Sequence, residues 1–176
     1  MSDGYDPNVD VDGDGNWDNV ESTPDGEGGY TITADMNGDG VADFEGHDAD
    51  GDGVVEDAYY DTDYNGTADE HWSDADGDGY LTEVEMDRNE DGKTDGVARD
   101  RNEDGAKDEA ALDNNYNGTA DTYVADDNYD GNVDTYGKDT DEDGTLNTTV
   151  SDTNFDGTAD TTTYGDPETN PYAGAK

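Results

Sequence analysis

The chain has 176 residues, of which 51 are acidic and only 7 are basic, so its formal net charge is −44. Nucleic acids and anionic membranes carry charge of the same sign, which argues against both as partners, and no apolar run approaches the ~20 residues of a membrane-spanning helix. Hydrophobic residues make up 28% of the chain, against about 45–50% in globular domains. A hydrophobic core of ordinary size is therefore excluded, and something else must offset the entropy of ordering the chain.

The chain begins with a lead-in, residues 1–9, in which a basic region and an apolar stretch are both missing, so no signal peptide is expected in this sequence. A first acidic loop starts at Asp10, and residues 23–34 form a degraded, twelve-residue version of the same unit. The segment 165–176 contains two prolines, which cannot donate backbone hydrogen bonds. It is predicted to be a C-terminal cap or linker.

From Asp35 to Tyr164 one unit recurs every 13 residues, ten times without interruption. Each repeat has Asp at position one, Asp or Asn at positions three and five, Gly at position six and usually an acidic residue at position nine; four freer residues follow. Self-similarity at a fixed period indicates a repeat architecture. Residues 10–164 are thus predicted to form one array, whose repeats begin at residues 10, 23 (degraded), 35, 48, 61, 74, 87, 100, 113, 126, 139 and 152.

The residues that recur at positions one, three, five, six and nine of the repeat predict calcium sites. Ca²⁺ takes six to eight oxygen ligands from carboxylates, amides and backbone carbonyls, and the glycine permits the positive backbone angle that curls a loop around the ion. We expect about one ion per repeat, roughly eleven in all. The predicted ligands are Asp10, Asp12, Asp14, Asp18, Asp35, Asn37, Asp39, Asp43, Asp48, Asp50, Asp52, Glu56, Asp61, Asp63, Asn65, Asp69, Asp74, Asp76, Asp78, Glu85, Asp87, Asn89, Asp91, Asp95, Asp100, Asn102, Asp104, Asp108, Asp113, Asn115, Asn117, Asp121, Asp126, Asn128, Asp130, Asp134, Asp139, Asp141, Asp143, Asn147, Asp152, Asn154, Asp156 and Asp160.

Bound calcium would also supply the missing stability. Eleven divalent ions would cancel half of the net charge, and a ligand at ~100 times its dissociation constant adds about 2.7 kcal/mol per site, or roughly 27 kcal/mol over ten sites. The chain has no cysteine, so metal would replace the disulfides that staple many small secreted modules.

The loops differ from EF-hands, which need a bidentate Glu at position twelve and flanking helices. Only the repeat at Asp74 fits the twelve-residue pattern closely, with Glu85 in that place. Glycine and loop residues are too dense for helices. A sensor that opens by moving helices is therefore not expected.

Closure by an acidic residue at position nine resembles the calcium loops of integrin-type propeller blades and thrombospondin type-3 repeats. The stretch DGEGGYTITADMNGDGVAD, from Asp25 to Asp43, is also similar to uncharacterised bacterial, chiefly actinobacterial, Asp-Gly repeat proteins. These resemblances imply calcium binding. The type-3 likeness further implies a chain wound irregularly around a string of ions.

Two folds follow from the pattern. Positions ten to thirteen carry strand formers, so the first is a β-rich, calcium-stabilised, solenoid-like rod of loop-plus-short-strand repeats without helices. Stacked coils would align like residues, such as Tyr123 with Tyr136 and Thr122 with Thr135. The alternative is the irregular wire implied by the type-3 resemblance.

The expected function is a calcium-binding structural protein that works as an extracellular or cell-surface spacer, stalk or filament subunit, with end-to-end assembly of copies. The alternatives are a calcium buffer or binding module, and an acidic surface that contacts mineral or ice. No nucleophile–base pair or phosphate-binding loop is present in the sequence, so no enzymatic activity is expected.

Overall fold

The computed structural model describes residues 20–75 and 77–165. The predicted lead-in, the first loop at Asp10 and the tail from residue 166 lie outside this range. The described residues form strands and turns and no helix, which confirms the β-rich prediction. The strands are β1 (Glu21–Pro24), β2 (Tyr30–Ala34), β3 (Phe44–Asp48), β4 (Asp57–Tyr60), β5 (Glu70–Ser73), β6 (Glu83–Met86), β7 (Gly96–Arg99), β8 (Glu109–Leu112), β9 (Thr122–Ala125), β10 (Thr135–Lys138), β11 (Thr148–Ser151) and β12 (Thr161–Tyr164).

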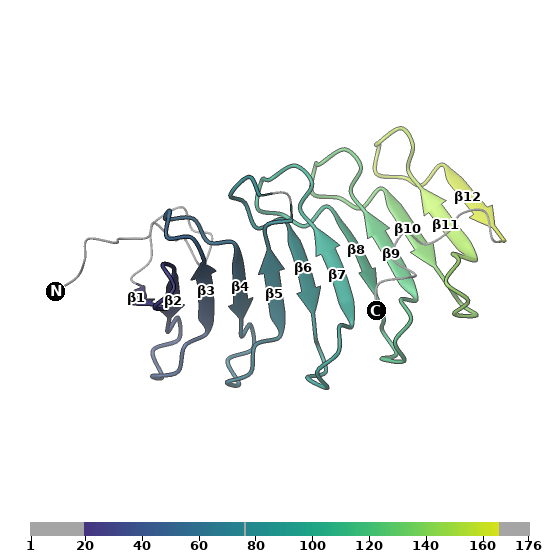
Figure 1. Ribbon diagram of the computed structural model, residues 1–176. Coiled ribbons are helices and arrows are strands. Elements are labelled where there is room, and N and C mark those ends of the chain that lie inside the picture. The colour runs from purple at the N-terminus through teal and green to yellow at the C-terminus, as the bar shows by residue number, and fades with distance from the viewer. Residues whose placement is uncertain (1–19, 76, 166–176) are drawn as a thin grey trace. The chain divides into compact units, whose positions relative to one another are not determined.

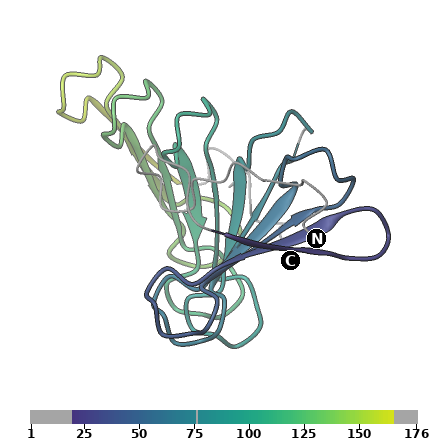
Figure 2. The same cartoon turned by 90° about the vertical axis from the view of Figure 1, so that its left-hand side faces the viewer.

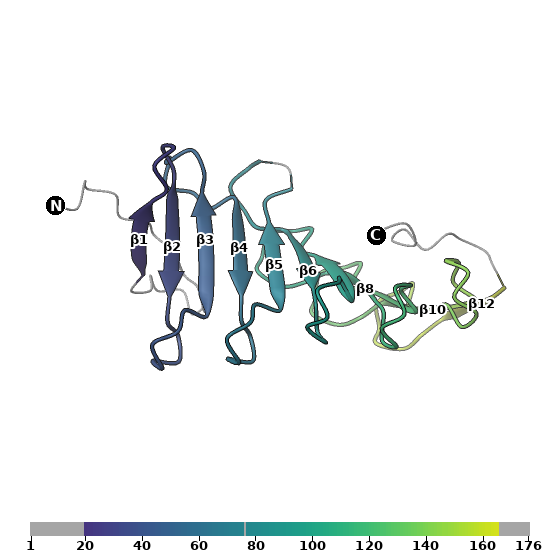
Figure 3. The same ribbon diagram turned by 60° about the horizontal axis from the view of Figure 1, so that its bottom comes forward.

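The chain divides into an N-terminal unit, Met1–Val84, and a C-terminal unit, Glu85–Lys176, with the division inside β6. In the N-terminal unit β1 to β5 pair in chain order, each antiparallel to the next. Strands β7 to β12 do the same in the C-terminal unit. Figure 1 shows the loops alternating between the two ends of the strands, Figure 3 shows β1 to β5 side by side in one layer, and Figure 2 shows the twist of those strands.

Each repeat forms one loop and one short strand, as predicted. Its last four residues are the strand, and its first nine form the loop that reverses the chain. The degraded repeat is shorter because Asp25 caps a tight turn, in which the Asp25 side chain accepts hydrogen bonds from the backbone N–H groups of Glu27, Gly28 and Gly29. One reversal per repeat makes neighbouring strands antiparallel, so the spatial period is two repeats.

The predicted ladders of like residues are wrong for this reason. Thr135 lies opposite Ala125 and Ser151, and Tyr136 lies opposite Val124 and Val150. Position ten therefore faces position thirteen, because an antiparallel partner runs through its repeat in the reverse order. The structure does not confirm a solenoid, since neighbouring repeats are joined as an antiparallel meander within each unit.

The N-terminal unit sorts its apolar side chains onto one face. Residues directly opposite each other share a face, and this face carries Ile32, Ala34, Phe44 and Ala58, all buried. Val55 and Leu81, both at position eight of their loops, pack against the same cluster. The rings of Phe44 and Tyr60 lie edge to face at 5.0 Å, and those of Tyr60 and Trp72 at 6.3 Å.

The C-terminal unit has a thinner apolar interior. Its buried strand residues are mainly small, including Ala98, Ala111 and Ala125. Leu146, at position eight, folds back over Gly137, where a Cβ atom would lie only 2.6 Å from a Leu146 methyl carbon. Glycine at this strand position therefore makes room for a side chain from the loop.

Candidate metal sites in the acidic loops

The position-one aspartate organises each loop from inside. In the loop at Asp126, Oδ1 accepts the N–H groups of Tyr129 at 2.7 Å and Asp130 at 3.3 Å, and Oδ2 accepts that of Gly131 at 2.7 Å. The equivalent bonds recur at Asp100 and Asp152. One carboxylate thus gathers the amides of positions four, five and six and folds the backbone around itself.

Positions three and five form successive turns of their own. In the loop at Asp48, Asp50 Oδ1 accepts the N–H of Asp52 at 3.0 Å, and Asp52 Oδ1 accepts that of Val54 at 2.9 Å. Such turns between a side chain and the amide two residues on are local and sequence-encoded. They hold one oxygen of each side chain against its own loop.

Position nine joins the end of the loop to its beginning. Asp134 Oδ2 accepts the N–H groups of Asp127 at 2.9 Å and Asn128 at 3.2 Å. Glu56 and Asn147, which occupy this position in other loops, accept the same position-two N–H. The ninth side chain therefore closes the ring whether it is Asp, Glu or Asn.

A left-handed backbone at position four is a feature that the sequence did not reveal. Position six is glycine in all ten repeats and has positive φ in each. Position four also has positive φ in all ten, although it is glycine only at Gly38, Gly51 and Gly77. The other seven positions strain an L-residue, at roughly 1–2 kcal/mol each. The side-chain identities vary too much along the chain for the pattern to predict this.

In three loops the acidic side chains converge closely enough to hold one ion. The groups are Asp48, Asp50, Asp52 and Glu56; Asp61, Asp63 and Asp69; and Asp139, Asp141 and Asp143; within each group, one ligand atom per residue lies within 4.8 Å of the others. Each of these loops has Asp at position three. The structure thus brings together ten of the predicted ligands in these three groups.

In loops with Asn at position three, the amide group can donate a hydrogen bond to the carboxylate at position nine. The Asn37 amide Nδ2 donates to Asp43 Oδ1 at 3.2 Å, and Asn154 Nδ2 donates to Asp160 Oδ1 at 3.2 Å. The amide hydrogens lie beside the carboxylate that closes the loop. An Asn at this position therefore softens the repulsion that a third carboxylate would create, while its oxygen remains a potential metal ligand.

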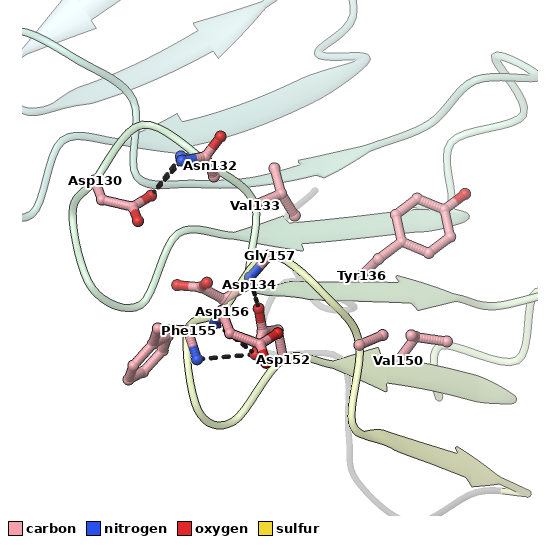
Figure 4. A pocket seen from close by; sticks show the side chains of 11 residues that line it. Asp130, Asn132, Val133, Asp134, Tyr136, Val150, Asp152, Phe155, Asp156 and Gly157 are labelled. Atoms are coloured by element: carbon pink, nitrogen blue, oxygen red, sulfur yellow. Dashed lines mark hydrogen bonds between the residues drawn. The ribbon is translucent and has the colours of Figure 1, made fainter.

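Neighbouring sites are linked along each end of the strands. Position nine of one loop and position one of the loop two repeats later are hydrogen-bonded through the backbone, as in Asp113 N to Asp95 O at 2.7 Å and Asp152 N to Asp134 O at 2.8 Å. Figure 4 shows Asp134 and Asp152 in the wall of a pocket of about 530 Å³ between two such loops. The carboxylates therefore form rows rather than isolated sites.

Burial of these carboxylates favours binding of a cation beside them. Among the described residues twelve aspartates are buried, against eleven hydrophobic side chains. Asp48 is 0% exposed and Asp139 is 2% exposed. Buried charges are normally paired or coordinate metals, because desolvating an unpaired charge is very costly. The buried aspartates occupy positions one and nine, whereas most side chains at positions three and five are exposed.

Hydrogen bonds within the loops favour the ionised form of the Asp121 and Asp61 carboxylates. Burial raises the pKa of Asp121, but hydrogen bonds from Thr122, Asn114 and Lys138 outweigh it and lower the pKa to about 2. At Asp61, burial likewise acts upward, and the backbone N–H groups of positions six, five and four lower the pKa below its ordinary value. Ionised carboxylates are the form that binds metal.

Some predicted ligands have a different or undescribed position. Asp10, Asp12, Asp14, Asp18 and Asp76 lie outside the described residues. Glu85 is an exposed strand residue in β6, three residues beyond Thr82, whose N–H closes the loop at Asp74 by donating to Ser73 O at 3.1 Å. The loop thus ends at position nine, and its ninth side chain is a threonine.

Side chains also connect loops that lie two repeats apart, which was not predicted from the sequence. Arg88 donates to the backbone carbonyl of Asp113 at 3.1 Å and lies over the Tyr116 ring at 5.8 Å. Arg101 repeats this arrangement with the Asp126 carbonyl at 3.2 Å and the Tyr129 ring at 5.6 Å. The recurrence of Arg at position two and Tyr at position four, 28 residues later, was the available signal.

Comparison with known proteins gives no family: no protein-family model, curated protein or solved structure matches the chain. The described residues include no helix of the length and apolar character needed to cross a membrane.

Proposed function

We propose that the chain is a calcium-binding structural repeat protein in which ions held by the loops do the work of a hydrophobic core. The observation that carries this proposal is that, among the described residues, twelve aspartates are buried against eleven hydrophobic side chains. The convergent groups at Asp48, Asp61 and Asp139 support it. So does the resemblance of the loops to those of thrombospondin type-3 repeats.

Calcium is the favoured ion because of the ligand chemistry. The loops offer only oxygen, from carboxylates, amides and backbone carbonyls, which suits a hard cation. They are irregular and vary in charge from two carboxylates at positions one, three, five and nine in the loop at Asp113 to four in the loop at Asp48. Ca²⁺ tolerates such variation, whereas Mg²⁺ demands near-ideal octahedral geometry and gives up its water reluctantly.

An extracellular or cell-surface setting belongs to this proposal. Extracellular calcium modules bind with dissociation constants of ~10⁻⁴–10⁻³ M, and a loop of two to four carboxylates without the bidentate position-twelve Glu is suited to that range. Assembly of copies end to end is also part of it. The terminal strand β12 has four exposed, uncharged residues whose backbone could pair with another chain.

A metal titration tests the proposal. The full chain is stripped with a chelator and titrated with Ca²⁺, with Mg²⁺ as the control ion, while bound metal and circular dichroism are measured together. We expect about one Ca²⁺ per repeat and a gain of β-structure that follows occupancy. A chain that binds no Ca²⁺ would contradict the proposal.

The same titration separates a structural protein from a buffer. Binding that leaves the spectrum unchanged, at sub-micromolar affinity, would favour a buffer. Negative-stain microscopy of the loaded protein tests assembly, since separate short particles at all concentrations would rule out the filament.

A further inference from the structure

The loop of residues 113–121 has the fewest carboxylates at the predicted ligand positions among the ten repeats. It alone carries amides at both positions three and five, Asn115 and Asn117, so its only carboxylates at the predicted ligand positions are Asp113 and Asp121. The other nine repeats supply three or four. Since affinity for Ca²⁺ follows the charge of the ligand set, this loop by itself should bind calcium most weakly.

The position-one carboxylate of this loop, Asp113, is nevertheless buried and lacks a partner for one of its oxygens. Asp113 is 4% exposed. Its Oδ2 accepts the N–H of Gly118 at 2.5 Å, whereas its Oδ1 is buried without a hydrogen-bond partner. The corresponding Oδ1 of Asp126 accepts the position-four N–H at 2.7 Å. A buried carboxylate oxygen without a donor is costly unless a cation contacts it.

A carboxylate from another loop lies against this site. Glu142, at position four of the loop at Asp139, accepts the Asn115 amide Nδ2 on Oε1 at 2.7 Å and the Asn117 amide Nδ2 on Oε2. The amide oxygens point the other way, toward their own loop, where Asn115 Oδ1 accepts the N–H of Asn117 at 3.2 Å and Asn117 Oδ1 that of Thr119 at 2.9 Å. Glu142 thus accepts a hydrogen bond from each amide group, so that both amide oxygens point toward their own loop.

The position of Glu142 depends in turn on its own loop. It is one of the left-handed residues at position four, with φ 60°, and its N–H donates to Asp139 Oδ1 at 2.7 Å. Asp139 belongs to the convergent group with Asp141 and Asp143. A cation held by this group would fix Asp139, and through it the backbone that presents Glu142 to the neighbouring loop.

We propose that Glu142 completes the cation site of loop 113–121 from the loop two repeats later, as a positioning residue that supplies the missing negative charge and orients Asn115 and Asn117. This inference rests on the proposed function. It predicts that the loops at Asp113 and Asp139 bind calcium with positive cooperativity, because occupancy of the second orders a group that the first requires. Outer partners that orient metal ligands change metal affinity by about 10–100-fold when they are removed.

Loop-resolved NMR tests the coupling in the full chain. The position-six amides of Gly118 and Gly144, bonded to Asp113 and Asp139, report the two loops separately during a Ca²⁺ titration. We expect Glu142→Gln to weaken binding at Gly118 by about 10-fold and to change binding at Gly144 less than about twofold. The matched control is Glu103→Gln, which removes the same charge at position four of the loop at Asp100; that loop is one repeat away, at the opposite end of the strands, so Gly118 should be unchanged.

A double-mutant cycle tests whether the effect passes through Glu142. Asp141→Ala weakens the loop at Asp139 and should also shift the Gly118 midpoint, by about fivefold; in the Glu142→Gln background the shift at Gly118 should vanish. Unchanged β9 and β10 amide signals show that each variant is folded.

The outcomes separate this inference from the function on which it rests. If Gly144 and the other loops respond to Ca²⁺ but Gly118 does not, or responds equally in the wild type and in Glu142→Gln, the inference fails and the proposed function stands. If no loop responds, both fail.

Discussion

The two units of the chain use the same repeat but hold their repeats together differently. In the N-terminal unit the strands share an apolar face around Phe44, and three of its four in-register loops have glycine at position four. In the C-terminal unit the buried strand residues are mostly small, and position four is never glycine despite its positive φ. The C-terminal position-four side chains Tyr116, Tyr129 and Glu142 contact loops two repeats away.

The same repeat can therefore be stabilised in two ways, by packing of an apolar strand face or by side-chain contacts between loops. Glycine at position four relieves backbone strain but offers no side chain, which suffices where a strand face already packs. A tyrosine or glutamate there accepts strain in return for a contact between loops. The C-terminal unit should therefore depend more strongly on the ions that hold its loops in shape.

Removal of metal is expected to destabilise both units and to separate them by the size of the effect. Chelation of the calcium-loaded protein should raise amide hydrogen exchange in β8 to β11 about tenfold more than in β2 to β4, a difference of ~1.4 kcal/mol, because only the latter retain an apolar face. Hydrogen exchange with mass spectrometry measures this. Equal acceleration in both units would show that the apolar face contributes little.

Phe44→Ala tests the apolar face of the N-terminal unit. Phe44 is 2% exposed at the centre of the N-terminal cluster, so its truncation should lower the free energy of unfolding of that unit by about 3–5 kcal/mol. Chemical denaturation followed by exchange of the β2–β5 amides checks this. Phe155→Ala is the matched control, since the only other phenylalanine is 47% exposed in a loop; a comparable loss there would refute the distinction.

Replacing a glycine that lies beneath a loop side chain by alanine should lower the stability of the two units by different amounts. A Cβ at Gly46 would lie 2.8 Å from the Phe44 ring and 3.1 Å from a Val55 methyl, whereas one at Gly137 meets only Leu146. Gly46→Ala should cost about 2–3 kcal/mol and Gly137→Ala about 1 kcal/mol, because the end of Leu146 can move and the buried ring cannot. Thermal unfolding measures both. In the Leu146→Ala background, Gly137→Ala should cause no further loss of stability if the clash is the cause.

The contact between loops in the C-terminal unit should be worth less. Arg101→Ala removes the hydrogen bond to the Asp126 carbonyl and the stacking on Tyr129, and we expect a loss of about 1 kcal/mol. Arg101→Lys should recover little of it, since an ammonium lacks the planar, bidentate geometry. Arg99→Ala, at an exposed strand position, is the control. Identical losses for Arg99 and Arg101 would indicate a general charge effect.

Acid is expected to produce the smallest difference between the units. Backbone N–H groups lower the pKa of Asp61 in one unit and of Asp152 in the other, in both cases against the upward effect of burial. Lowered pKa values contribute stability that is present above the ordinary value of 3.8 and is lost as the pH falls through the folded value. The Asp61 and Asp152 carboxylates, followed by NMR during acid titration, should therefore both titrate below 3.8. A midpoint at or above 3.8 for either residue would contradict the lowered pKa values.

Local chemistry made much of the site predictable. The 13-residue period, the ligand positions and the strand over the last four residues of each repeat follow from short-range interactions, in which Asp and Asn side chains bond amides two to five residues away. The loop is therefore encoded within nine residues. The positive φ at position four was hidden because seven different repeats fill it with Tyr, Glu or Phe.

The sequence by itself determined the composition of each loop, its closure by the ninth residue and the absence of an ordinary hydrophobic core. Only the tertiary structure decided that the repeats alternate in direction, so that loops two repeats apart become neighbours. That pairing brings Arg88 to Tyr116 and Glu142 to Asn115 and Asn117. Such contacts follow from strand direction, which a periodic sequence leaves open because its repeats could stack in parallel coils or fold back as a meander.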